Sequence, residues 1–419
     1  MIITKIKEFT KKLAKYILWW PASPKVTYFW GELFFKIMGM RCKRYDLTLT
    51  EIQKVLIIRL DEIGDIVMTT PFLREIRRNL PSAWIALVVN PQVYNLVELC
   101  PYVNEVLVYN WRVSKFLKPL QRHWRALCLA RKHLWKQHFD LVIVPRWDID
   151  NYHATFIAYF SGASWRVGYS ENVNEIKNQF NKGFDKFFTH VLKDQTVKHE
   201  VEHNLDIIRF LGGEIKEDHL ELWLSKEDEA FAEWIIMNHN IGWKDLLVGI
   251  GPGASTSNRE WPLQSFIELG KWLIKEYNAK IIVVGGSKEE NLGRMLKQEL
   301  GNNVINTAGM TTLRQTAALL KHCQLFIGND SGPMHLAAAM GVPIVELSCH
   351  PLTGSPYAVN SPYRFGPWGV KNIILQPHLP TPPCHEQCII INKPHCILGI
   401  SVEQVKQAVV NILTKIDNT

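Results

Sequence analysis

From residue 54 onward, short apolar runs alternate with longer segments in which apolar residues recur at helical spacing. The runs VLIIRL, WIALVVN, EVLVYN and LVIVPR are nearly continuous in apolar side chains, which is typical of parallel strands covered on both faces. A helix is expected from about Ile66 to Asn79. The same alternation of apolar runs and helical segments begins again with LLVGIGPG and KIIVVGG. This pattern predicts an α/β chain with two successive doubly wound domains, at residues 51–224 and 225–398.

The first 50 residues form a distinct basic arm. They contain ten Lys and Arg against three acidic residues, and so carry +7 of the formal net charge of +8. Apolar residues from Ile3 to Trp20 recur at helical spacing, with Lys at most of the other positions. Such a helix lies in a membrane interface, and the next apolar run, 28–40, is too short and too charged to span a bilayer. We expect residues 1–45 to bind an anionic membrane surface; the alternative is that both helices pack on the protein.

Charge and cysteine content narrow the function classes. The rest of the chain carries only +1 and has no evident basic patch, which argues against nucleic acid as a partner. The eight cysteines mostly lack the spacing of a disulfide framework, and no cleavable signal peptide is recognisable. Both observations favour a reducing, cytoplasmic location.

One candidate binding loop lies in the stretch LFIGNDSGPMHLAAAMGVPIVEL, residues 325–347, which predicts a strand, a loop, a helix and a second strand. Asp330 or Ser331 can cap the helix, and Pro333 suits its first turn. Backbone N–H groups and the positive end of the helix dipole then converge on one point, which suits an anion such as phosphate. The alternative is a well-capped unit without a ligand.

A second candidate phosphate loop is GIGPGAS, residues 249–255, at the end of another predicted strand. Glycines and small hydroxyl side chains let backbone amides approach a phosphate closely. Pro252 and the late start of the next helix set this loop apart from a dinucleotide fingerprint. Arg259 follows and can neutralise a diphosphate, although a solvated loop arginine fits the same position.

Three carboxylates, Asp61, Glu62 and Asp65, follow the first strand, where open α/β sheets bind their ligands. One of them can serve as a general base. Their alternative role is to cap the next helix and offset its dipole. Their spacing alone does not choose among them.

A further motif has the residue types of a zinc site. His199, Glu200 and His203 fit H-E-x-x-H on a predicted helix, with Glu221 within reach as a third ligand. That interpretation would make the protein a zinc hydrolase. We favour packing roles for these residues, because five-residue matches of this kind arise by chance and no supporting third histidine follows.

Two more groups have residue types that bind metals. Asp148 and Asp150 form an acid pair after a strand, which could hold a divalent ion. A late group of cysteines and histidines would bind a metal or form a disulfide, although its spacing misses C-x-x-C. Its members are Cys384, Cys388 and Cys396, with His385 and His395 nearby.

Several motifs together resemble glycosyltransferase family 9, the ADP-heptose:lipopolysaccharide heptosyltransferases. They are KVLIIRLDEIGDIVMTTPFLREIRRNLP, FDLVIVPR, SGASWRVGY, HNLDIIRFLG, GIGPGASTSNREWP, VVGGSKEE and GNDSGPMHLAAAMGVPIVEL, and the similarity covers about residues 54–415. The resemblance implies a GT-B fold, in which two Rossmann-like domains face each other across a cleft and a last helix, 399–419, returns to the first domain. It also implies inverting, metal-independent transfer of a sugar, usually from ADP-heptose, to a lipopolysaccharide core sugar.

The resemblance also implies a role for each matching position. It implies Asp65 as the catalytic base, with Gly64 and Arg59 on the acceptor side. It implies no metal and no cofactor, and it makes His199 and His203 packing or surface residues. The implied donor-binding residues hold the diphosphate, the ribose or the sugar, and they are Ser255, Thr256, Arg259, Glu289, Asp330, Ser331, Gly332 and His335.

The sequence departs from the family in two places. Arg259 stands where some members carry Lys before a Trp-Pro pair, and the basic arm has no counterpart in compact members. The leading hypothesis is a glycosyltransferase at the cytoplasmic face of the plasma membrane, with a lipid-linked glycan acceptor. The alternatives are a family member that uses another nucleotide sugar, a zinc hydrolase, and a non-catalytic scaffold that binds nucleotide sugars.

Overall fold

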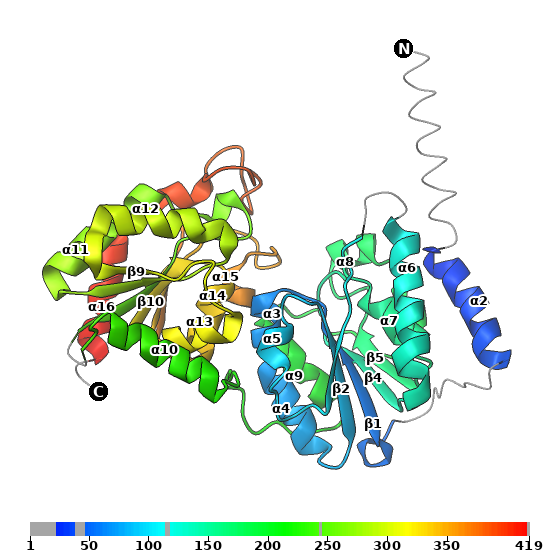
Figure 1. Ribbon diagram of the computed structural model, residues 1–419. Helices are drawn as coiled ribbons and strands as arrows, with labels where there is room; N and C mark the ends of the chain where they lie inside the picture. The colour runs from blue at the N-terminus through cyan, green and yellow to red at the C-terminus, as the bar shows by residue number, and fades with distance from the viewer. Residues whose placement is uncertain (1–21, 38–46, 114–117, 243–244, 417–419) are drawn as a thin grey trace.

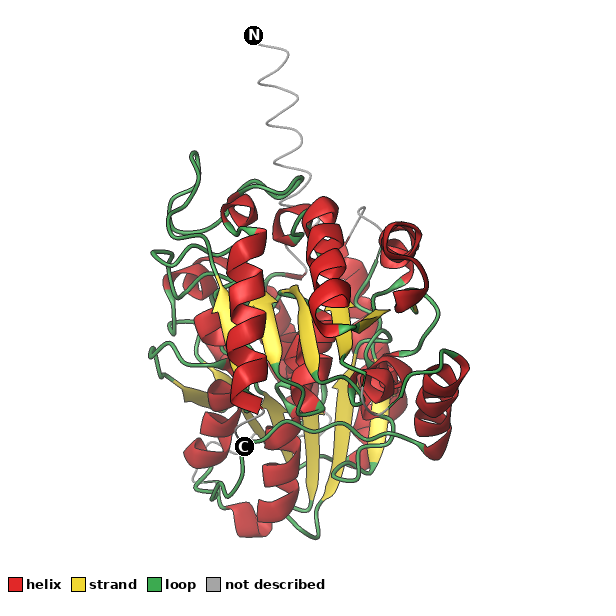
Figure 2. Ribbon diagram, turned by 90° about the vertical axis from the view of Figure 1, so that its left-hand side faces the viewer, coloured by secondary structure: helices red, strands yellow, loops and turns green. Residues whose placement is uncertain are grey.

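The computed structural model describes residues 22–37, 47–113, 118–242 and 245–416, and within them the chain forms two lobes (Figure 1). Each lobe contains a parallel six-stranded sheet. Helices cover both faces of these sheets (Figure 1, Figure 2). The predicted α/β chain with two doubly wound sheets is therefore confirmed.

The first sheet has the strand order β3-β2-β1-β4-β5-β6. Its strands are β1 (Lys54–Ile58), β2 (Trp84–Val89), β3 (Glu105–Val108), β4 (Leu141–Val144), β5 (Trp165–Tyr169) and β6 (His190–Leu192). β1 lies at the centre, where Val55 pairs with Ile85 of β2 and with Leu141 of β4. Every residue of β1 after Lys54 is buried, because helices cover both faces of the sheet.

The helices of the first lobe differ from the prediction at one functionally relevant place. They are α3 (Ile63–Val67), α4 (Thr70–Asn79), α5 (Tyr94–Val97), α6 (Lys118–Leu129), α7 (Ala154–Phe160), α8 (Glu175–Phe180) and α9 (Glu200–Phe210). Instead of one helix from Ile66 to Asn79, the structure has α3 and α4. The break precedes Pro71 in the first turn of α4, because proline has no N–H to continue the helical hydrogen bonds. Asp65 therefore lies in the first turn of its own short helix.

The second sheet repeats this topology with the order β12-β11-β10-β7-β8-β9. Its strands are β7 (Leu247–Gly251), β8 (Lys280–Val283), β9 (Val304–Asn306), β10 (Leu325–Asn329), β11 (Ile344–Leu347) and β12 (Asn372–Leu375). The winding direction reverses between β1 and β4 in the first sheet and between β7 and β10 in the second. Open α/β sheets bind ligands at the carboxyl ends of the strands beside such a switch point.

The last helix of the second lobe lies elsewhere than expected. The helices of this lobe are α10 (Lys226–Asn238), α11 (Leu263–Tyr277), α12 (Glu290–Leu300), α13 (Leu313–Leu320), α14 (Gly332–Ala339), α15 (Pro362–Phe365) and α16 (Val402–Ile416). The expectation that the last helix returns to the first domain is wrong, because α16 packs on α11, β11 and β12 (Figure 1). Val405, Val409 and Ile412 are buried in the core of the second lobe, and this apolar burial holds the helix there.

Part of the basic arm is described, as helix α2 (Pro24–Ile37). α2 packs on the first lobe, where the rings of Phe35 and Tyr159 meet edge to face with centroids 5.3 Å apart. The amphipathic helix predicted within residues 3–20 lies outside the described residues. No helix in the described ranges has the length and apolar character needed to cross a bilayer.

Candidate active site

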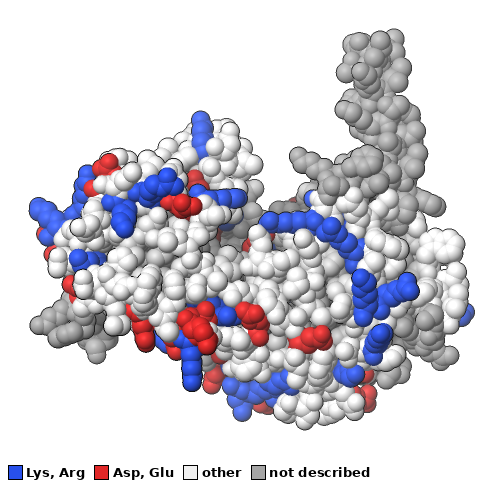
Figure 3. Space-filling view, in the orientation of Figure 1, with Lys and Arg blue, Asp and Glu red and all other residues white. Residues whose placement is uncertain are grey.

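The switch points of the two sheets meet at the junction of the lobes. α3 follows β1, α14 follows β10, and these two helices pack together (Figure 1). A Cβ atom on Gly64 in α3 would lie 2.5 Å from Cδ2 of His335 in α14, so the approach requires a glycine. Figure 3 shows the surface hollowed between the lobes, with Lys and Arg side chains on both rims. Gly64, expected on the acceptor side, thus lies against His335, expected on the donor side.

Asp65 is a partly exposed carboxylate at this junction. Its Oδ1 accepts a hydrogen bond from Nη2 of Arg59 at 3.1 Å, and its side chain is 21% exposed. Burial raises the pKa of Asp65 to about 6; the Arg59 guanidinium opposes this rise, and the Glu200 carboxylate adds to it. A carboxylate whose pKa lies just below neutrality is suited to accept a proton from a hydroxyl group.

The two neighbouring carboxylates have different surroundings. Asp61 is buried between the guanidinium groups of Arg59 and Arg146, and its Oδ2 lies 3.2 Å from Nε of Arg59. Glu62 is exposed and precedes α3 as its N-cap without a capping hydrogen bond from its side chain. Asp61 is therefore committed to an ion pair and Glu62 faces solvent, which leaves Asp65 as the carboxylate best placed for proton transfer.

A buried charge network behind Asp65 was not identified from the sequence. Oε1 of Glu200 accepts a hydrogen bond from Nη2 of Arg364 at 2.5 Å, and Oε2 of Glu200 lies 3.9 Å from Nη2 of Arg59. Nη1 of Arg364 also donates to Oδ2 of Asp148 at 2.9 Å. Arg364 belongs to α15, which follows β11, whereas its two carboxylate partners belong to the first lobe. The network therefore joins the lobes directly behind the candidate base.

The H-E-x-x-H sequence does not form a zinc site. His199 is the N-cap of α9, and its ring stacks on Trp368 with centroids 4.5 Å apart. His203 is buried and stacks on Trp147 with centroids 4.6 Å apart. Within the part of the chain that the structure describes, these histidines and Glu200 are not a group whose ligand atoms converge. The zinc-hydrolase hypothesis is therefore wrong, and both histidines have packing roles.

The other carboxylates considered as metal ligands also have protein partners. Glu221, the expected third zinc ligand, accepts a hydrogen bond from Nη1 of Arg74 at 2.5 Å. Asp150 accepts one from the backbone N–H of Thr155 at 2.7 Å, in the first turn of α7. Asp148 is committed to Arg364. Helix capping and ion pairing therefore account for the acid pair.

On the donor side, Arg259 and Asp330 come together. Arg259 ends the 3-10 helix Ser257–Arg259 that follows β7, and its Nη1 lies 3.1 Å from Oδ2 of Asp330. Burial raises the pKa of Asp330, and the Arg259 guanidinium opposes that rise. Because the Arg259 side chain is 21% exposed, a diphosphate can reach the guanidinium.

Asn329, which was not predicted as a functional residue, holds the loop that carries Arg259. Its Nδ2 donates to the backbone carbonyl of Pro252 at 2.8 Å, and its Oδ1 accepts from the backbone N–H of Trp261 at 3.0 Å. Asn329 is fully buried at the carboxyl end of β10. The position of Asn329 directly before Asp330 is the sequence feature that could have indicated its role.

The first turn of α14 lies at the lobe junction. Gly332 lies against the side chain of Ile63 in α3, so the positive end of the α14 dipole points into the junction. Pro333 lies in this turn as predicted. Ser331, one of the two predicted caps, is the N-cap residue, but its Oγ donates to the carbonyl of Asn329 at 3.1 Å and makes no capping hydrogen bond.

His335 faces α3 as a neutral imidazole. Burial, with a further contribution from His199, lowers its pKa to about 3. Its Nδ1 is buried and has no hydrogen-bond partner among the described residues. A buried ring nitrogen without a partner is suited to a hydrogen bond with a bound sugar or phosphate.

The remaining expected donor residues lie around the loop that follows β7. Glu289 packs against Gly253, where a Cβ atom would clash with its side chain, and its Oε2 accepts from the N–H of Gly286 at 2.7 Å. Ser255 is exposed and Thr256 is half-buried on the same loop. Ser255, Thr256 and Arg259 thus follow the carboxyl end of β7, and Glu289 follows that of the neighbouring strand β8.

Sequence comparison places these features in a known family. A sequence profile of glycosyltransferase family 9 (heptosyltransferase) matches residues 128–393, more than half of the chain. The lipopolysaccharide core heptosyltransferase OpsX of Haemophilus influenzae is 22% identical over 329 residues, covering 78% of this chain and 85% of that protein. Lipopolysaccharide heptosyltransferase 2 of Salmonella typhimurium is 24% identical over 317 residues, covering 70% of this chain and 82% of that protein.

Solved structures have the same fold. A family 9 glycosyltransferase from Veillonella parvula superposes with a TM-score of 0.72 and 22% identity, covering 88% of this chain and 99% of that one. The ADP-heptose lipopolysaccharide heptosyltransferase II of E. coli gives a TM-score of 0.62 and 20% identity, covering 87% and 100%. The predicted GT-B architecture of two Rossmann-like domains is therefore confirmed. Because the family profile matches more than half of this chain, the chain belongs to glycosyltransferase family 9, the heptosyltransferase family, and is a glycosyltransferase.

Proposed function

We propose that this enzyme transfers heptose from ADP-heptose to a lipopolysaccharide core sugar, with inversion of configuration at the anomeric carbon. Asp65 takes the proton of the acceptor hydroxyl while the acceptor oxygen forms a bond to the anomeric carbon of the donor. ADP leaves from the opposite face with the electron pair of the broken bond. Arg259 and the N-terminus of α14 stabilise the negative charge that develops on the diphosphate. The observation that supports this proposal is the packing of α3, which contains Asp65, on α14, whose first turn follows Asp330.

The choice of donor and acceptor rests on the relatives. The Haemophilus and Salmonella proteins are lipopolysaccharide heptosyltransferases, and E. coli heptosyltransferase WaaC has been solved with ADP and with ADP-2-deoxy-2-fluoro heptose. Calorimetric titration of the full chain with ADP-heptose, ADP-glucose and UDP-sugars tests the donor. We expect ADP-heptose to bind most tightly. Tighter binding of another nucleotide sugar would refute the substrate proposal and leave the family assignment intact.

The pH dependence of the reaction should follow the ionisation of Asp65. The base must be ionised to accept a proton, and its pKa is raised to about 6. We therefore expect kcat/KM to fall as the pH drops through about 6 and to reach a plateau above it. Initial rates at limiting substrate concentrations measure this profile. A profile that stays flat through this range would argue against Asp65 as the base.

Arg259→Ala should lower kcat/KM by about 10²–10³-fold, a typical effect of removing one transition-state donor. The variant loses the guanidinium at the diphosphate and leaves Asp330 as an unpaired carboxylate there. Arg259→Lys keeps the charge without the two-pronged geometry and should recover part of the rate. Arg294→Ala is the matched control, because this α12 arginine is 59% exposed and pairs with Glu290 on the surface. Wild-type kinetics in Arg259→Ala would contradict its assigned role.

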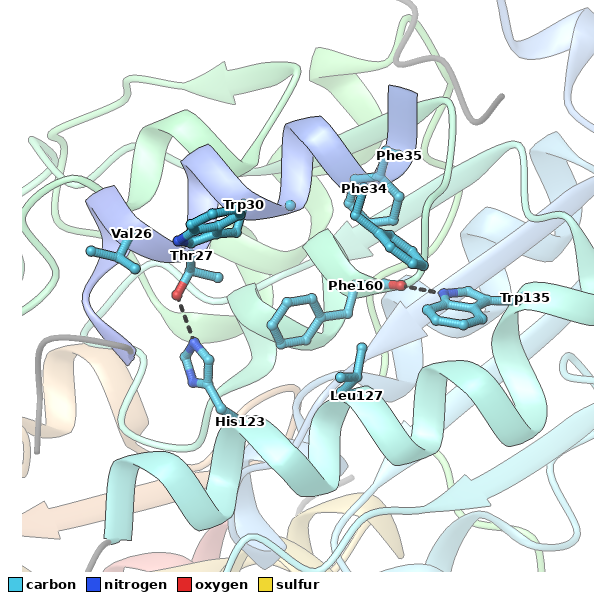
Figure 4. Close-up of a pocket in the computed structure, with 10 residues that line it drawn as sticks. Val26, Thr27, Trp30, Phe34, Phe35, His123, Leu127, Trp135 and Phe160 are labelled. Atoms are coloured by element: carbon cyan, nitrogen blue, oxygen red, sulfur yellow. Dashed lines mark hydrogen bonds between the residues drawn. The ribbon is translucent and has the colours of Figure 1, made fainter. Parts of the chain in front are cut away.

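We further propose that the enzyme binds peripherally to the cytoplasmic face of the plasma membrane through its N-terminal arm. On α2, Phe29, Trp30 and Ile37 are 65%, 60% and 76% exposed. Beneath the helix, an apolar cavity of about 280 Å³ lies between α2, α6 and α7, with Trp30 and Phe34 on one wall and Leu127 on another (Figure 4). Exposed aromatic and aliphatic side chains that follow a lysine-rich segment in the sequence suit the interface of an anionic leaflet.

Charged substitutions on α2 should release the protein from membranes. We expect the double variant Phe29→Glu, Ile37→Glu to bind anionic vesicles at least about tenfold more weakly than wild type. The introduced carboxylates cannot enter the apolar boundary of the membrane, and they are repelled by its negative charge. Co-sedimentation with phosphatidylglycerol vesicles measures this binding. Trp234→Glu is the matched control, since this aromatic side chain is 58% exposed on α10 in the other lobe. Equal binding by the α2 variant and the control would refute the membrane role of α2.

A further inference from the structure

The fold brings three cysteines and one histidine of the segment after β12 to one point. They are Cys384, Cys388, His395 and Cys396, and their ligand atoms all lie within 4.8 Å of one another. Nδ1 of His395 lies 3.5 Å from Sγ of Cys384 and 3.5 Å from Sγ of Cys396. The three cysteines are 2%, 8% and 0% exposed, in chain order. His385, also considered from the sequence, is exposed and lies outside the group.

We infer that these four residues bind a structural zinc ion. Tetrahedral zinc, with bonds of roughly 2.3 Å to sulfur and 2.0–2.1 Å to nitrogen, holds its ligand atoms about 3.6–3.8 Å apart. The observed sulfur–nitrogen separations of 3.5 Å agree with that geometry. All three cysteines are free thiols, so no disulfide explains their convergence. Three thiolates and one imidazole around one point are a donor set that selects zinc.

The backbone around the cluster supports ligation. The N–H of Ile389 donates to Sγ of Cys384 at 3.4 Å, a contact of the kind that orients a sulfur ligand. The N–H of Cys384 in turn donates to the carbonyl of Thr381 at 2.9 Å, which fixes the start of the turn. Between β12 and α16 the regular structure is limited to the 3-10 helix Cys396–Gly399. A metal would tie together a segment that has few backbone hydrogen bonds of its own.

The cluster lies behind the loop that carries Arg259. The 3-10 helix Cys396–Gly399 packs against the 3-10 helix Ser257–Arg259. Nε1 of Trp261 donates to the carbonyl of Ile400 at 2.9 Å, and the cysteines share one apolar core with Trp261. The ion would therefore fix the wall against which the candidate diphosphate loop rests. Since protein ligands fill all four positions, its role is structural and it takes no part in the transfer step.

Metal analysis of the full chain tests this inference without an activity assay. For protein purified under reducing conditions, we expect elemental analysis to find about one zinc ion per chain. Cobalt added to zinc-depleted protein should give the visible absorption of a tetrahedral thiolate site. Cys384→Ser and Cys396→Ser should lose stoichiometric zinc, whereas Cys128→Ser, in α6 of the other lobe, should retain it. Far-UV circular dichroism shows whether each variant remains folded.

A second readout connects the ion to the donor loop. Zinc-depleted wild-type protein should melt at a lower temperature and bind ADP more weakly, and added zinc should restore both properties. Wild-type protein that lacks zinc and gives no cobalt–thiolate absorption would overturn the inference. So would a disulfide among these cysteines found by mass spectrometry of the native protein, or full zinc retention in Cys384→Ser. None of these outcomes depends on which sugar nucleotide the enzyme uses.

Discussion

Asp65→Asn is expected to lower kcat by about 10²–10⁴-fold, the range associated with loss of a general base. The amide has nearly the same shape as the carboxylate, but it cannot take the proton of the acceptor hydroxyl. Arg59 keeps its contact with Asp61 and its hydrogen bond to the carbonyl of Pro145, so the fold should persist. Donor affinity should change little, because Arg259 and α14 are untouched. Steady-state kinetics together with calorimetry of donor binding separate these two effects.

Glu62→Gln is the matched control for that experiment. It makes the same chemical change three residues earlier, on an exposed side chain. We expect near wild-type kcat from this variant. Full activity in Asp65→Asn, or an equal loss in Glu62→Gln, would mean that the proton goes to another group.

Arg364→Met should destabilise the folded protein by about 3–5 kcal/mol, as is typical when one partner of a buried ion pair is removed. The variant leaves Asp148 and Glu200 buried without the guanidinium that joins them. Because this arginine links the two lobes, the loss should also loosen their junction. Urea unfolding measures the free energy change, and small-angle scattering detects a more open particle.

Arg209→Met is the control, because the Arg209 side chain is 47% exposed, its partner Glu202 is partly exposed, and Asp206 keeps its ion pair with Lys198. Its cost should stay below about 1 kcal/mol. An equal, small cost for both variants would show that the buried network contributes little.

Glu200 adds a pH signature to the same network. Burial tends to raise its pKa, but Arg364, His203 and Arg59 outweigh that tendency and hold the pKa at about 2, below the ordinary 4.5. The stabilisation from this ionised group is therefore complete above about pH 4.5 and is lost as the pH falls toward 2. In Arg364→Met this acid sensitivity should diminish.

The architecture was predictable because it follows from local pattern. Near-continuous apolar strands such as β1 and β7 require cover on both faces, and their alternation with helices leaves a doubly wound parallel sheet as the economical solution. The positions of the loops after β1, β7 and β10, at the carboxyl ends of central strands, were predictable for the same reason. The break between α3 and α4 was missed, although Pro71 signals it.

The arrangement within the site depends on contacts between distant segments, which periodicity does not encode. Nothing local distinguishes Asp61 from Asp65; Arg146, far along the chain, pairs with Asp61 and leaves Asp65 at the junction. Glu200 matched a zinc motif in the local sequence. Its partner Arg364 lies far along the chain in the other lobe, so the local sequence could not reveal this ion pair. The cysteine cluster does not follow a standard metal-binding motif. Three residues separate Cys384 from Cys388, and His395 is directly adjacent to Cys396 in the sequence.

The most direct test of the proposed reaction is to follow heptose transfer to its product. Wild-type enzyme of known zinc content is incubated with ADP-heptose and a lipopolysaccharide acceptor that lacks the heptose, with no divalent ion added. NMR then determines the anomeric configuration of the new linkage. We predict release of ADP and a linkage whose configuration is inverted relative to the donor. A retained configuration, a requirement for an added divalent ion, or tight donor binding without transfer would contradict the proposed mechanism.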